Sequence, residues 1–250
     1  MTSSLFNPEM LDHRLPKTAQ VYQLLRSAII SLRLQPGEII SEKELCAQLD
    51  VSRTPIREAL LQLEGQKLVT IRPNSSTFVS PIKLKDVLEG QLIREALERR
   101  SVRLAARFFQ DKDVDTFSTL LMLQKSAAKR DDADTFYQLD EDFHKLICET
   151  STYPNLWRLL NGAKGQLDRV RRFAFPVQHQ FDEVLEEHEK IISAICTRDE
   201  EKAEQCMLGH LDSIFGTLQV LIDKHGEFFA EDAHLIKECQ DLSDFRRLID

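Results

Sequence analysis

The stretch from Val51 to Leu63, VSRTPIREALLQL, constrains the fold of this chain more than any other stretch. Its apolar residues recur at the spacing of one helix face, and they are Ile56, Ala59, Leu60 and Leu63. Ser52 suits the N-cap position, and Pro55 in the first turn costs little because the first N–H groups of a helix have no internal partner. The stretch therefore predicts an amphipathic helix that starts just after Ser52.

Three polar side chains of this helix, Arg53, Thr54 and Arg57, lie off the apolar face and near the amino-terminal end. A recognition helix presents side chains from that end to base edges and phosphates in the DNA major groove. An ordinary surface helix with two arginines would show the same pattern. The flanking sequence has to decide between these two interpretations.

The residues before this helix complete a helix-turn-helix. An apolar helical pattern starts at Lys17 and ends before the turn Gln35-Pro36-Gly37. Ser41 and Glu44 have the spacing of a capping box, which predicts a short helix that ends near Leu49. Two short helices joined by a tight turn form a helix-turn-helix.

The residues after this helix predict a wing. Two β-type runs, Leu68–Arg72 and Thr77–Ser80, flank the turn cluster 73–76. A hairpin directly behind a helix-turn-helix is typical of a winged helix. We therefore predict a winged helix-turn-helix domain at 15–82, preceded by a flexible lead at 1–14.

From Leu84 onward the pattern is helical, with breaks near Pro154 and Pro176. The expected helices are 84–109, 113–130, 134–151, 155–174, 181–197 and 200–224. The residues expected in their core are Phe117, Leu120, Leu121 and Trp157. The fold class is thus mainly α: a winged helix with a small β-hairpin wing, then an all-α antiparallel bundle at 83–224. A charged extension at 225–250 follows, with a tail helix that packs back on the body as one alternative.

The charge distribution restricts where a nucleic acid can bind. The net charge is −8, yet residues 1–82 hold nine basic and eight acidic side chains, and the remainder holds 24 and 33. An acidic body repels phosphate, so DNA is expected to meet only the amino-terminal part. Five scattered cysteines without a CxxC pattern predict reduced thiols in the cytoplasm. There is no signal-peptide pattern, and no apolar window approaches the ~18–20 residues of a membrane span.

Four residues of the second domain have the chemistry of a metal site. Asp140 and His144 lie four residues apart, on one helix face, and His188 and His210 lie on or beside the apolar stripes of two further helices. A single inward histidine is usually a core residue, but three with a carboxylate favour a metal: Zn²⁺ first, with Ni²⁺, Mn²⁺ or Fe²⁺ as alternatives. The residues expected on other faces or at the surface are Glu141, Asp142, His13, His179, His225 and His234.

Taken together, these motifs resemble the GntR family of bacterial transcription regulators, in the FadR subfamily with the FCD ligand-binding domain. The segments that carry the resemblance are PGE at 36–38, SEKEL at 41–45, VSRTPIREAL at 51–60, the wing, IREALE at 93–98, LDEDFH at 139–144, His188 and His210. The resemblance covers about residues 17–222. It departs at Lys67, where the family usually has glycine, and at the wing tip Asn74-Ser75-Ser76-Thr77, where it usually has glycine near an arginine.

The resemblance implies a homodimer on a palindromic operator, with a metal held by Asp140, His144, His188 and His210 and a small carboxylate effector that reaches this metal. The residues expected at the DNA are Ser41, Lys43, Ser52, Arg53, Thr54 and Arg57, with Lys43 in a place where many members have arginine. Arg94 is the first candidate for the effector carboxylate, and Asn161 and Arg169 are weaker ones. Structural salt bridges or surface positions are the alternative for all three.

We therefore expect a metabolite-responsive repressor and not an enzyme. The helix at 84–109 joins the two domains and is the expected transmitter between them. A metal-dependent hydrolase with a DNA-binding domain is one alternative, because such a site can activate water. Against it, the sequence shows no convincing general base or nucleophile motif. A DNA-binding dimer with a purely structural helical domain is the other alternative.

Overall fold

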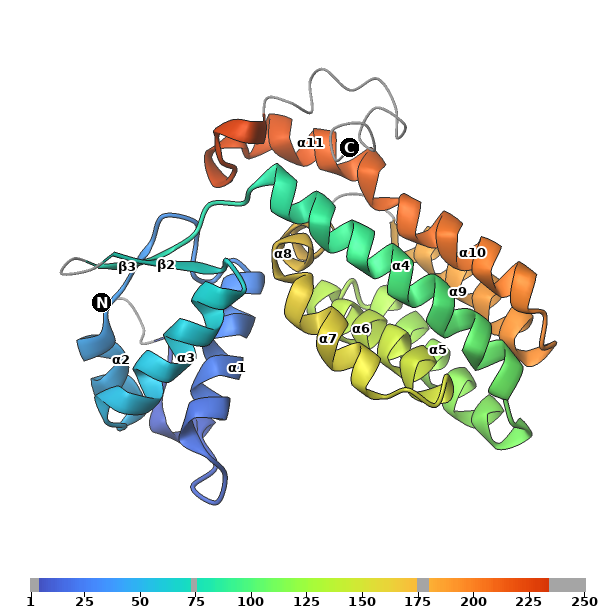
Figure 1. Cartoon of the computed structure of the whole chain (residues 1–250), viewed down its shortest axis with the longest axis horizontal. Coiled ribbons are helices and arrows are strands. Elements are labelled where there is room, and N and C mark those ends of the chain that lie inside the picture. Colours follow the sequence, from blue (N-terminus) through green and yellow to red (C-terminus); the bar gives the residue numbers. More distant parts are fainter. Residues whose placement is uncertain (1–4, 73–75, 175–179, 234–250) are drawn as a thin grey trace.

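A computed structural model describes residues 5–72, 76–174 and 180–233. Figure 1 shows a small amino-terminal domain beside a larger bundle of helices, with the long helix α4 leading from one into the other. The mainly α fold class and the winged helix-turn-helix are confirmed. Several predicted features lie outside the described residues: wing-tip residues Asn74 and Ser75, Pro176, His179, His234 and most of the predicted tail.

The amino-terminal domain packs three helices around one core. They are α1 (Lys17–Ile30), α2 (Glu42–Leu49) and α3 (Arg53–Gly65). The Ser41 Oγ accepts a hydrogen bond from the Glu44 N–H at 3.2 Å, as the capping pattern predicts. Asp50 takes a left-handed conformation (φ +51°) that turns the chain from α2 into α3. Ser52 is the N-cap of α3 by its backbone, but its hydroxyl makes no capping hydrogen bond, so the predicted hydroxyl cap is wrong.

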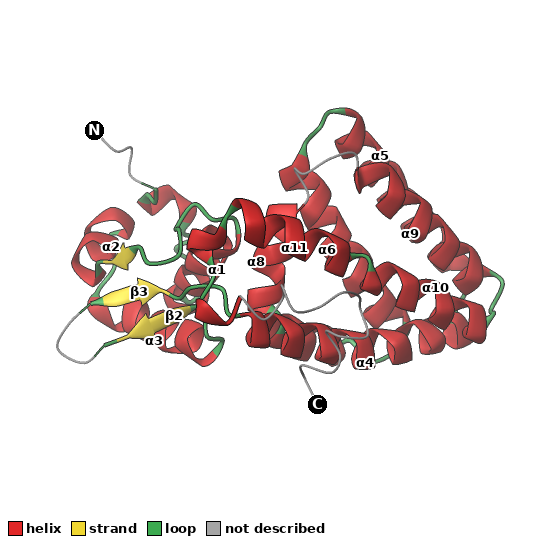
Figure 2. Ribbon diagram, turned by 90° about the horizontal axis from the view of Figure 1, so that it is seen from above, coloured by secondary structure: helices red, strands yellow, loops and turns green. Residues whose placement is uncertain are grey.

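A three-stranded antiparallel sheet, drawn in yellow in Figure 2, completes this domain. Its strands are β1 (Ile39–Ile40), β2 (Val69–Ile71) and β3 (Thr77–Val79), in the order β1-β3-β2. Phe78 pairs with Ile39 on one side and with Thr70 on the other. The sequence predicted only the β2–β3 hairpin, since a strand as short as β1 has no alternating pattern to detect.

The second domain consists of eight helices in the described part of the chain. They are α4 (Leu84–Phe108), α5 (Val114–Lys129), α6 (Ala133–Thr150), α7 (Asn155–Ala163), α8 (Gly165–Ala174), α9 (Gln180–Cys196), α10 (Glu200–Asp212) and α11 (Ile214–Lys224). Two of the predicted helices are wrong in their extent, because each predicted range contains two helices in the structure. The predicted 155–174 helix breaks at Lys164, before Gly165, and the predicted 200–224 helix breaks at Ser213. The Ser213 hydroxyl donates to the His210 carbonyl, which a continuing helix would use for its backbone.

The core of the bundle contains Phe117, Phe143 and Met207, all of which are buried. The prediction for Phe117 is thus confirmed, whereas Leu120 and Leu121 are only partly buried. The prediction that Trp157 lies in the core is wrong, because Trp157 is half-buried and faces a cavity between the domains. The helical period could not show this, because Trp157 lies on the short helix α7 beside the other domain.

The domain junction explains one of the sequence departures. Lys67 takes a left-handed conformation (φ +60°), which glycine adopts at lower cost. Its ammonium donates to Asp86 at 2.5 Å and to Glu89 at 3.0 Å, both on α4, and its carbonyl accepts from Gln166 on α8 at 2.7 Å. A lysine at this position therefore ties the first wing strand to the helical domain, which a glycine side chain could not do.

The described part of the carboxyl-terminal extension packs against the segment between the domains. Ile82 donates its N–H to the Phe228 carbonyl at 2.9 Å and accepts from the Ala230 N–H at 2.8 Å. Phe229 and Ala233 are buried in the same cluster as Ile82. Up to residue 233 the extension therefore packs on the body, whereas most of the tail helix considered as one alternative lies outside the described residues. Among the described helices, none is both long enough and apolar enough to cross a membrane.

Two helical glycines provide a matched test of how closely α4 packs on α8. A Cβ on Gly90 would lie 3.3 Å from the Leu167 Cβ and 3.3 Å from the Lys164 Cα, whereas a Cβ on Gly209 would meet nothing within 4 Å. We expect Gly209→Ala to raise the free energy of unfolding by about 0.5–1 kcal/mol, since alanine favours helix. We expect Gly90→Ala to lower it by about 1 kcal/mol through overpacking. Urea denaturation measures both, and equal gains would contradict the packing described.

Candidate metal centre

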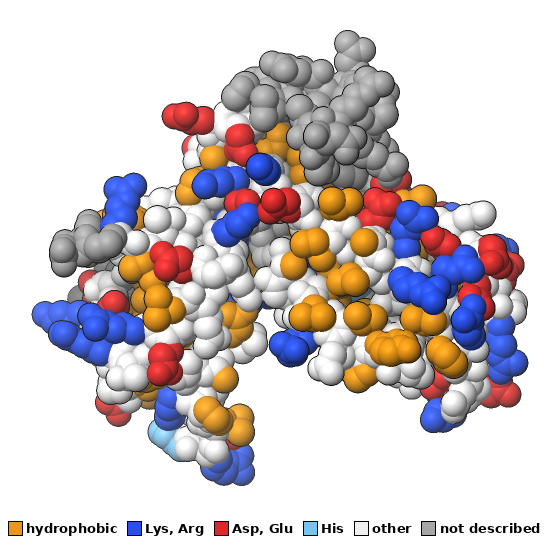
Figure 3. Space-filling view, viewed as in Figure 1, with side chains coloured by type: hydrophobic (Ala, Val, Ile, Leu, Met, Phe, Trp, Pro, Cys, Tyr) orange, Lys and Arg blue, Asp and Glu red, His pale blue; other side chains and the backbone are white. Residues whose placement is uncertain are grey.

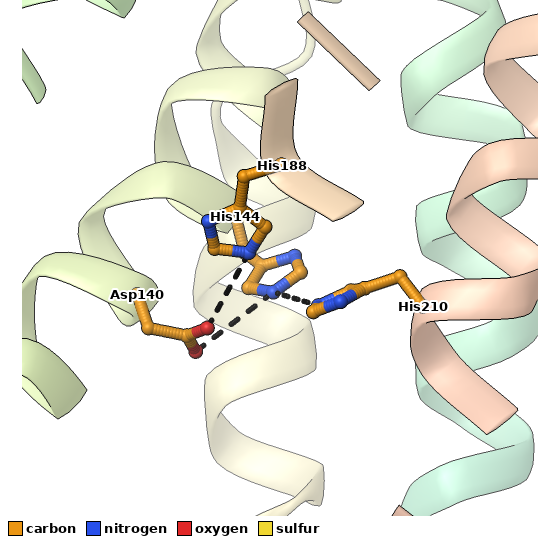
Figure 4. A group of neighbouring side chains, drawn as sticks. All are labelled: Asp140, His144, His188 and His210. Carbon is orange, nitrogen blue, oxygen red and sulfur yellow. Dashed lines mark hydrogen bonds and ion pairs between the residues drawn. The ribbon is translucent and has the colours of Figure 1, made fainter. Parts of the chain in front are cut away.

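Three helices of the bundle bring the four predicted ligands together. Asp140 and His144 lie one turn apart on α6, His188 lies on α9 and His210 lies on α10 (Figure 4). One donor atom from each residue lies within 4.8 Å of all the others, and all four residues are buried. The His144 and His210 Nε2 atoms are 3.2 Å apart, and the His188 Nε2 is 3.5 Å from the Asp140 Oδ1. Ligand atoms around a tetrahedral metal at ~2.1 Å lie about 3.4 Å apart, so this spacing fits.

Each imidazole has its other nitrogen, Nδ1, against a hydrogen-bond acceptor. The acceptors are Glu98 for His144 at 2.5 Å, Gln124 for His188 at 3.0 Å and Glu187 for His210 at 2.7 Å. An acceptor at Nδ1 places the proton of the neutral ring there and leaves a lone pair on Nε2. All three histidines therefore direct Nε2 toward one point; the His144 Nε2 accepts there from the Arg94 Nη2 at 2.7 Å, so Arg94 would have to move when a metal binds.

Two atoms at this point lack hydrogen-bond partners within the described residues: the Asp140 Oδ1 and the His188 Nε2. Buried polar atoms are rarely left in this state, because an unmade hydrogen bond in the interior costs about 1–3 kcal/mol. Lone pairs on His144 and His210 also face each other at 3.2 Å. A divalent cation would satisfy all of these atoms at once, so the donor set fits the metal expected from sequence.

The protonation of the histidines supports the same conclusion. Burial lowers the pKa of His144 well below its usual value, and the nearby positive charge of Arg94 lowers it further. Burial also lowers the pKa of His188, and His210 adds to the effect. The His188 ring is fixed by stacking on Phe143, with ring centroids 3.9 Å apart. Both rings are therefore neutral near pH 7 and able to bind a metal.

Of the three residues expected to meet the effector, the structure brings Arg94 to this centre. Its Nη2 donates to the His144 Nε2 at 2.7 Å, and its Nε donates to Glu98 at 2.7 Å. Asn161 lies instead at the cavity between the domains. Arg169 lies at the domain junction, where it donates to the Ser80 carbonyl at 2.7 Å and where burial lowers its pKa to about 9.

A buried ion pair also engages the Asp140 carboxylate. Arg171, on α8, donates one nitrogen to the Asp140 Oδ2 and another to Glu141 at 2.6 Å. Glu141 in turn accepts from the Lys164 ammonium at 2.5 Å. Glu141 does lie on a different helix face from Asp140, as predicted, but it is buried. Arg171 therefore fixes one oxygen of Asp140 and leaves the other to face the histidines.

The same ion pairs continue to the amino-terminal domain. Lys164 also donates to Asp168 at 2.5 Å, and Asp168 accepts from Arg26 of α1 at 2.9 Å. Arg26 donates to the Asn161 carbonyl as well, at 2.9 Å. Contiguous buried ion pairs therefore link the Asp140 carboxylate to a helix of the amino-terminal domain.

Sequence reasoning missed the residues around the four ligands. They are Glu98, Gln124, Glu187, Lys164, Asp168, Arg171 and Arg26. Two signals were available: Lys164 and Asp168 have the i,i+4 spacing of a helical ion pair, and Gln124 interrupts an apolar stretch. The partners on other helices, such as Arg26 for Asp168, have no signal in the sequence.

The residues expected at the DNA lie on α2 and α3. Lys43, Ser52, Arg53, Thr54 and Arg57 are exposed, and Ser41 is half-buried. Arg57 pairs with Glu42 at 3.0 Å, which ties the start of α3 to α2. Arg72, not in the predicted set, lies at the end of β2 over the Phe78 ring. Both helices, or the cap residues just before them, thus present exposed polar side chains to solvent.

Comparison with known proteins identifies the family of this fold. The model of the gntR family of bacterial regulatory proteins matches residues 17–79, and the FCD domain model matches 91–213. The chain belongs to the GntR family. It is a transcription regulator with an FCD domain and not an enzyme, and its relatives carry the same assignment.

Two relatives show how far the GntR regulator resembles proteins of known name. The HTH-type transcriptional repressor RspR of Escherichia coli (strain K12) is 31% identical over 217 residues, which are 87% of this chain and 95% of RspR. The gluconate operon transcriptional repressor of Bacillus licheniformis is 27% identical over 225 residues, which are 88% of this chain and 92% of the repressor. Among solved structures, E. coli McbR/YncC shares the fold with a TM-score of 0.73 and 22% identity, over 84% of this chain and 99% of that one.

The buried ion pairs predict that a substitution of the same size, which removes only the charge, strongly lowers the free energy of unfolding. Asp168→Asn leaves Lys164 and Arg26 without a shared counter-charge in the interior, so we expect the free energy of unfolding to fall by about 3–5 kcal/mol. Glu149→Gln removes an exposed pair with Lys145, and we expect a change of less than about 0.5 kcal/mol. Urea denaturation compares the two. A similar, small loss in both variants would show that the pairs across α7, α8 and α1 contribute little.

Proposed function

We propose that this GntR regulator is a homodimeric repressor that binds a palindromic operator and responds to a small carboxylate metabolite through a divalent metal, with Zn²⁺ as the first candidate. Because its operator is part of the cell's DNA, we also place it in the cytoplasm. Two relatives are named as repressors, which supports repression rather than activation. The proposed binding of metal and metabolite rests on one observation: three histidine Nε2 atoms and one carboxylate oxygen converge in the buried centre.

The proposed DNA interface rests on the exposed amino-terminal end of α3. Arg53, Thr54 and Arg57 are exposed there, and the helix packs its opposite face into the core through Ile56 and Leu60. Guanidinium groups bind guanine edges and phosphates in two-pronged contacts, and each good base contact contributes ~1–3 kcal/mol of discrimination. One small domain makes few such contacts, so two copies on a two-fold operator are needed for affinity.

The proposed dimer is supported by apolar side chains on the surface of the second domain. Figure 3 shows hydrophobic side chains gathered over α4 and α7, on the face toward the viewer. Leu92 and Ile93 of α4 are 51% and 38% exposed, and Leu159 of α7 is 54% exposed. Exposed apolar patches on this scale are typical of protein–protein contacts. We propose this face as the contact with a second copy, which would place two α3 helices on one operator.

The proposed metal would be held by Asp140, His144, His188 and His210. When bound, the cation supplies a positive charge and open coordination positions for an oxygen of the effector. Arg94 lies at the edge of this centre, with its guanidinium already aimed at His144. An effector carboxylate would accept hydrogen bonds from Arg94, and its binding would shift this side chain on α4, the helix that leads to the DNA-binding domain. The effector can change DNA affinity only by as much as its own affinity differs between the two domain arrangements.

The recognition-helix assignment predicts that Arg57→Ala lowers operator affinity by at least about tenfold, since a lost charged contact costs roughly 1.5–3 kcal/mol. Fluorescence anisotropy with operator DNA measures the affinity. Arg130→Ala, an exposed arginine at the end of α5, serves as the matched control and should bind as the unchanged protein does. If Arg57→Ala retains full affinity, the assignment of α3 is wrong.

The metal-site assignment predicts that His188→Ala contains at least about tenfold less metal than the unchanged protein after equal exposure to Zn²⁺, because one of four ligands is lost. Elemental analysis measures this content. His13→Ala, an exposed histidine of the amino-terminal segment, is the control and should retain full metal. Full metal in His188→Ala would instead favour a purely structural bundle.

A further inference from the structure

A second cavity lies at the junction of the two domains, separate from the centre of Figure 4. Its volume is about 840 Å³, and its walls come from α1 of the DNA-binding domain and from α6, α7 and α8 of the helical domain. Clefts of ~300–1,000 Å³ are the usual size for small-molecule sites, and domain junctions are a common place for them. Figure 1 shows α1 facing α7 and α8 across this junction.

Cationic side chains from both domains line this cavity. Arg26 and Arg33 come from the amino-terminal domain, and Lys145 and Arg172 come from the helical domain. Arg33 forms no ion pair with any residue that the structure describes; it donates only to the Ser31 hydroxyl, at 3.1 Å. The Arg26 side chain is 11% exposed, and its Nε has no acceptor in the described ranges. The walls therefore offer donors that the protein itself does not use.

Arg172, by contrast, has partners of its own: it pairs with Asp134 and donates to the Ala133 and Asp134 carbonyls at 3.2 and 3.3 Å. Its carboxylate partner, Asp134, is 85% exposed, so water weakens that pair. Burial lowers the pKa of Arg172, and the positive charge of Arg33 across the cavity lowers it further. Two guanidinium groups from different domains thus repel each other, and an anion between them would remove this repulsion.

Of the three carboxylates in the cavity walls, Asp134 pairs with Arg172. Glu141 already accepts from Lys164 and Arg171, and Asp142 accepts from Gln138. None of the three pairs with Arg33, so the positive charge of Arg33 has no counter-charge among the residues described.

Trp157 adds a flat apolar surface to the cavity. It is half-buried on α7, and its indole N–H has no acceptor among the residues described. The Lys164 ammonium lies 5.3 Å from its ring centroid, and the Asn161 side chain lies one helical turn further along the same wall. An indole ring beside guanidinium groups is suited to a ligand with an aromatic ring and a carboxylate.

We propose that this cavity is a second ligand site, which binds a small aromatic carboxylate between the two domains. Arg33 and Arg172 hold the carboxylate from opposite sides, and Trp157 packs against the ring. The ligand contacts both domains at once, so it stabilises the arrangement in which α1 and α8 lie close together. Its floor includes Arg26 and Glu141, which belong to the ion pairs that lead to Asp140.

The chain provides its own reporter, since Trp157 is its single tryptophan. The experiment titrates the full-length protein with benzoate after its metal has been removed with a chelator, and follows the tryptophan fluorescence. Removing the metal takes the cation out of the proposed effector site, and the Arg33 and Arg172 substitutions described next distinguish the cavity from Arg94. We expect a saturable fluorescence change, confirmed as one-to-one binding by isothermal titration calorimetry.

Substitutions then locate the binding. We expect Arg33→Gln and Arg172→Gln each to weaken benzoate at least tenfold, and Arg158→Gln, an exposed arginine of α7 outside the cavity, to bind as the unchanged protein does. Circular dichroism melting verifies that each variant is folded; Arg33 is exposed, so its change carries little risk to the fold. Trp157→Ala, followed by calorimetry, should weaken benzoate but not inorganic phosphate.

Three results would overturn the proposal. They are no saturable change with benzoate, equal binding by Arg33→Gln and the unchanged protein, and binding that appears only when metal is present. The last result would assign all carboxylate binding to the histidine centre. Equal effects of Trp157→Ala on benzoate and phosphate would overturn the aromatic part of the assignment.

Discussion

The pairing of buried charge between α6 and α8 is the interaction on which the rest of the structure depends. Asp140 is buried in the interior, and a buried carboxylate is stable only when it is paired and hydrogen-bonded. Arg171 provides that pairing, and it needs Glu141 as a second partner for its own charge. Glu141 then requires Lys164, and Lys164 requires Asp168. Each buried charge thus fixes the position of the next.

This requirement extends across the domain junction. Asp168 accepts from Arg26 of the DNA-binding domain, so the last charge of the bundle is neutralised by the other domain. Lys67 makes a second tie, from the first wing strand to α4 and α8. The described carboxyl-terminal extension makes a third, through its hydrogen bonds with Ile82. The relative placement of the two domains therefore depends on polar contacts, which ligands and metals are able to bias.

Much of this could be predicted from sequence, for local reasons. The helix-turn-helix, the hairpin and the four ligands come from periodicity, capping and residue chemistry over short stretches, as Ser41 and Glu44 illustrate. The errors have physical causes as well. Trp157 has the spacing of a core residue but faces another domain. The breaks at Lys164 and Ser213 depend on a glycine and on a hydroxyl hydrogen bond within otherwise helical patterns.

By itself, the sequence determined which residue types lie on each helix face, because the helical repeat links spacing to direction. It therefore determined that Asp140 and three histidines turn inward. Only the tertiary structure decided that the three histidine Nε2 atoms converge on an oxygen of Asp140. It also decided that Arg94 lies at this centre while Arg169 lies at the domain junction, and that a cavity separates α1 from α7. These outcomes depend on how helices far apart in the chain pack together, and the spacing of residues along one helix carries no information about its neighbours.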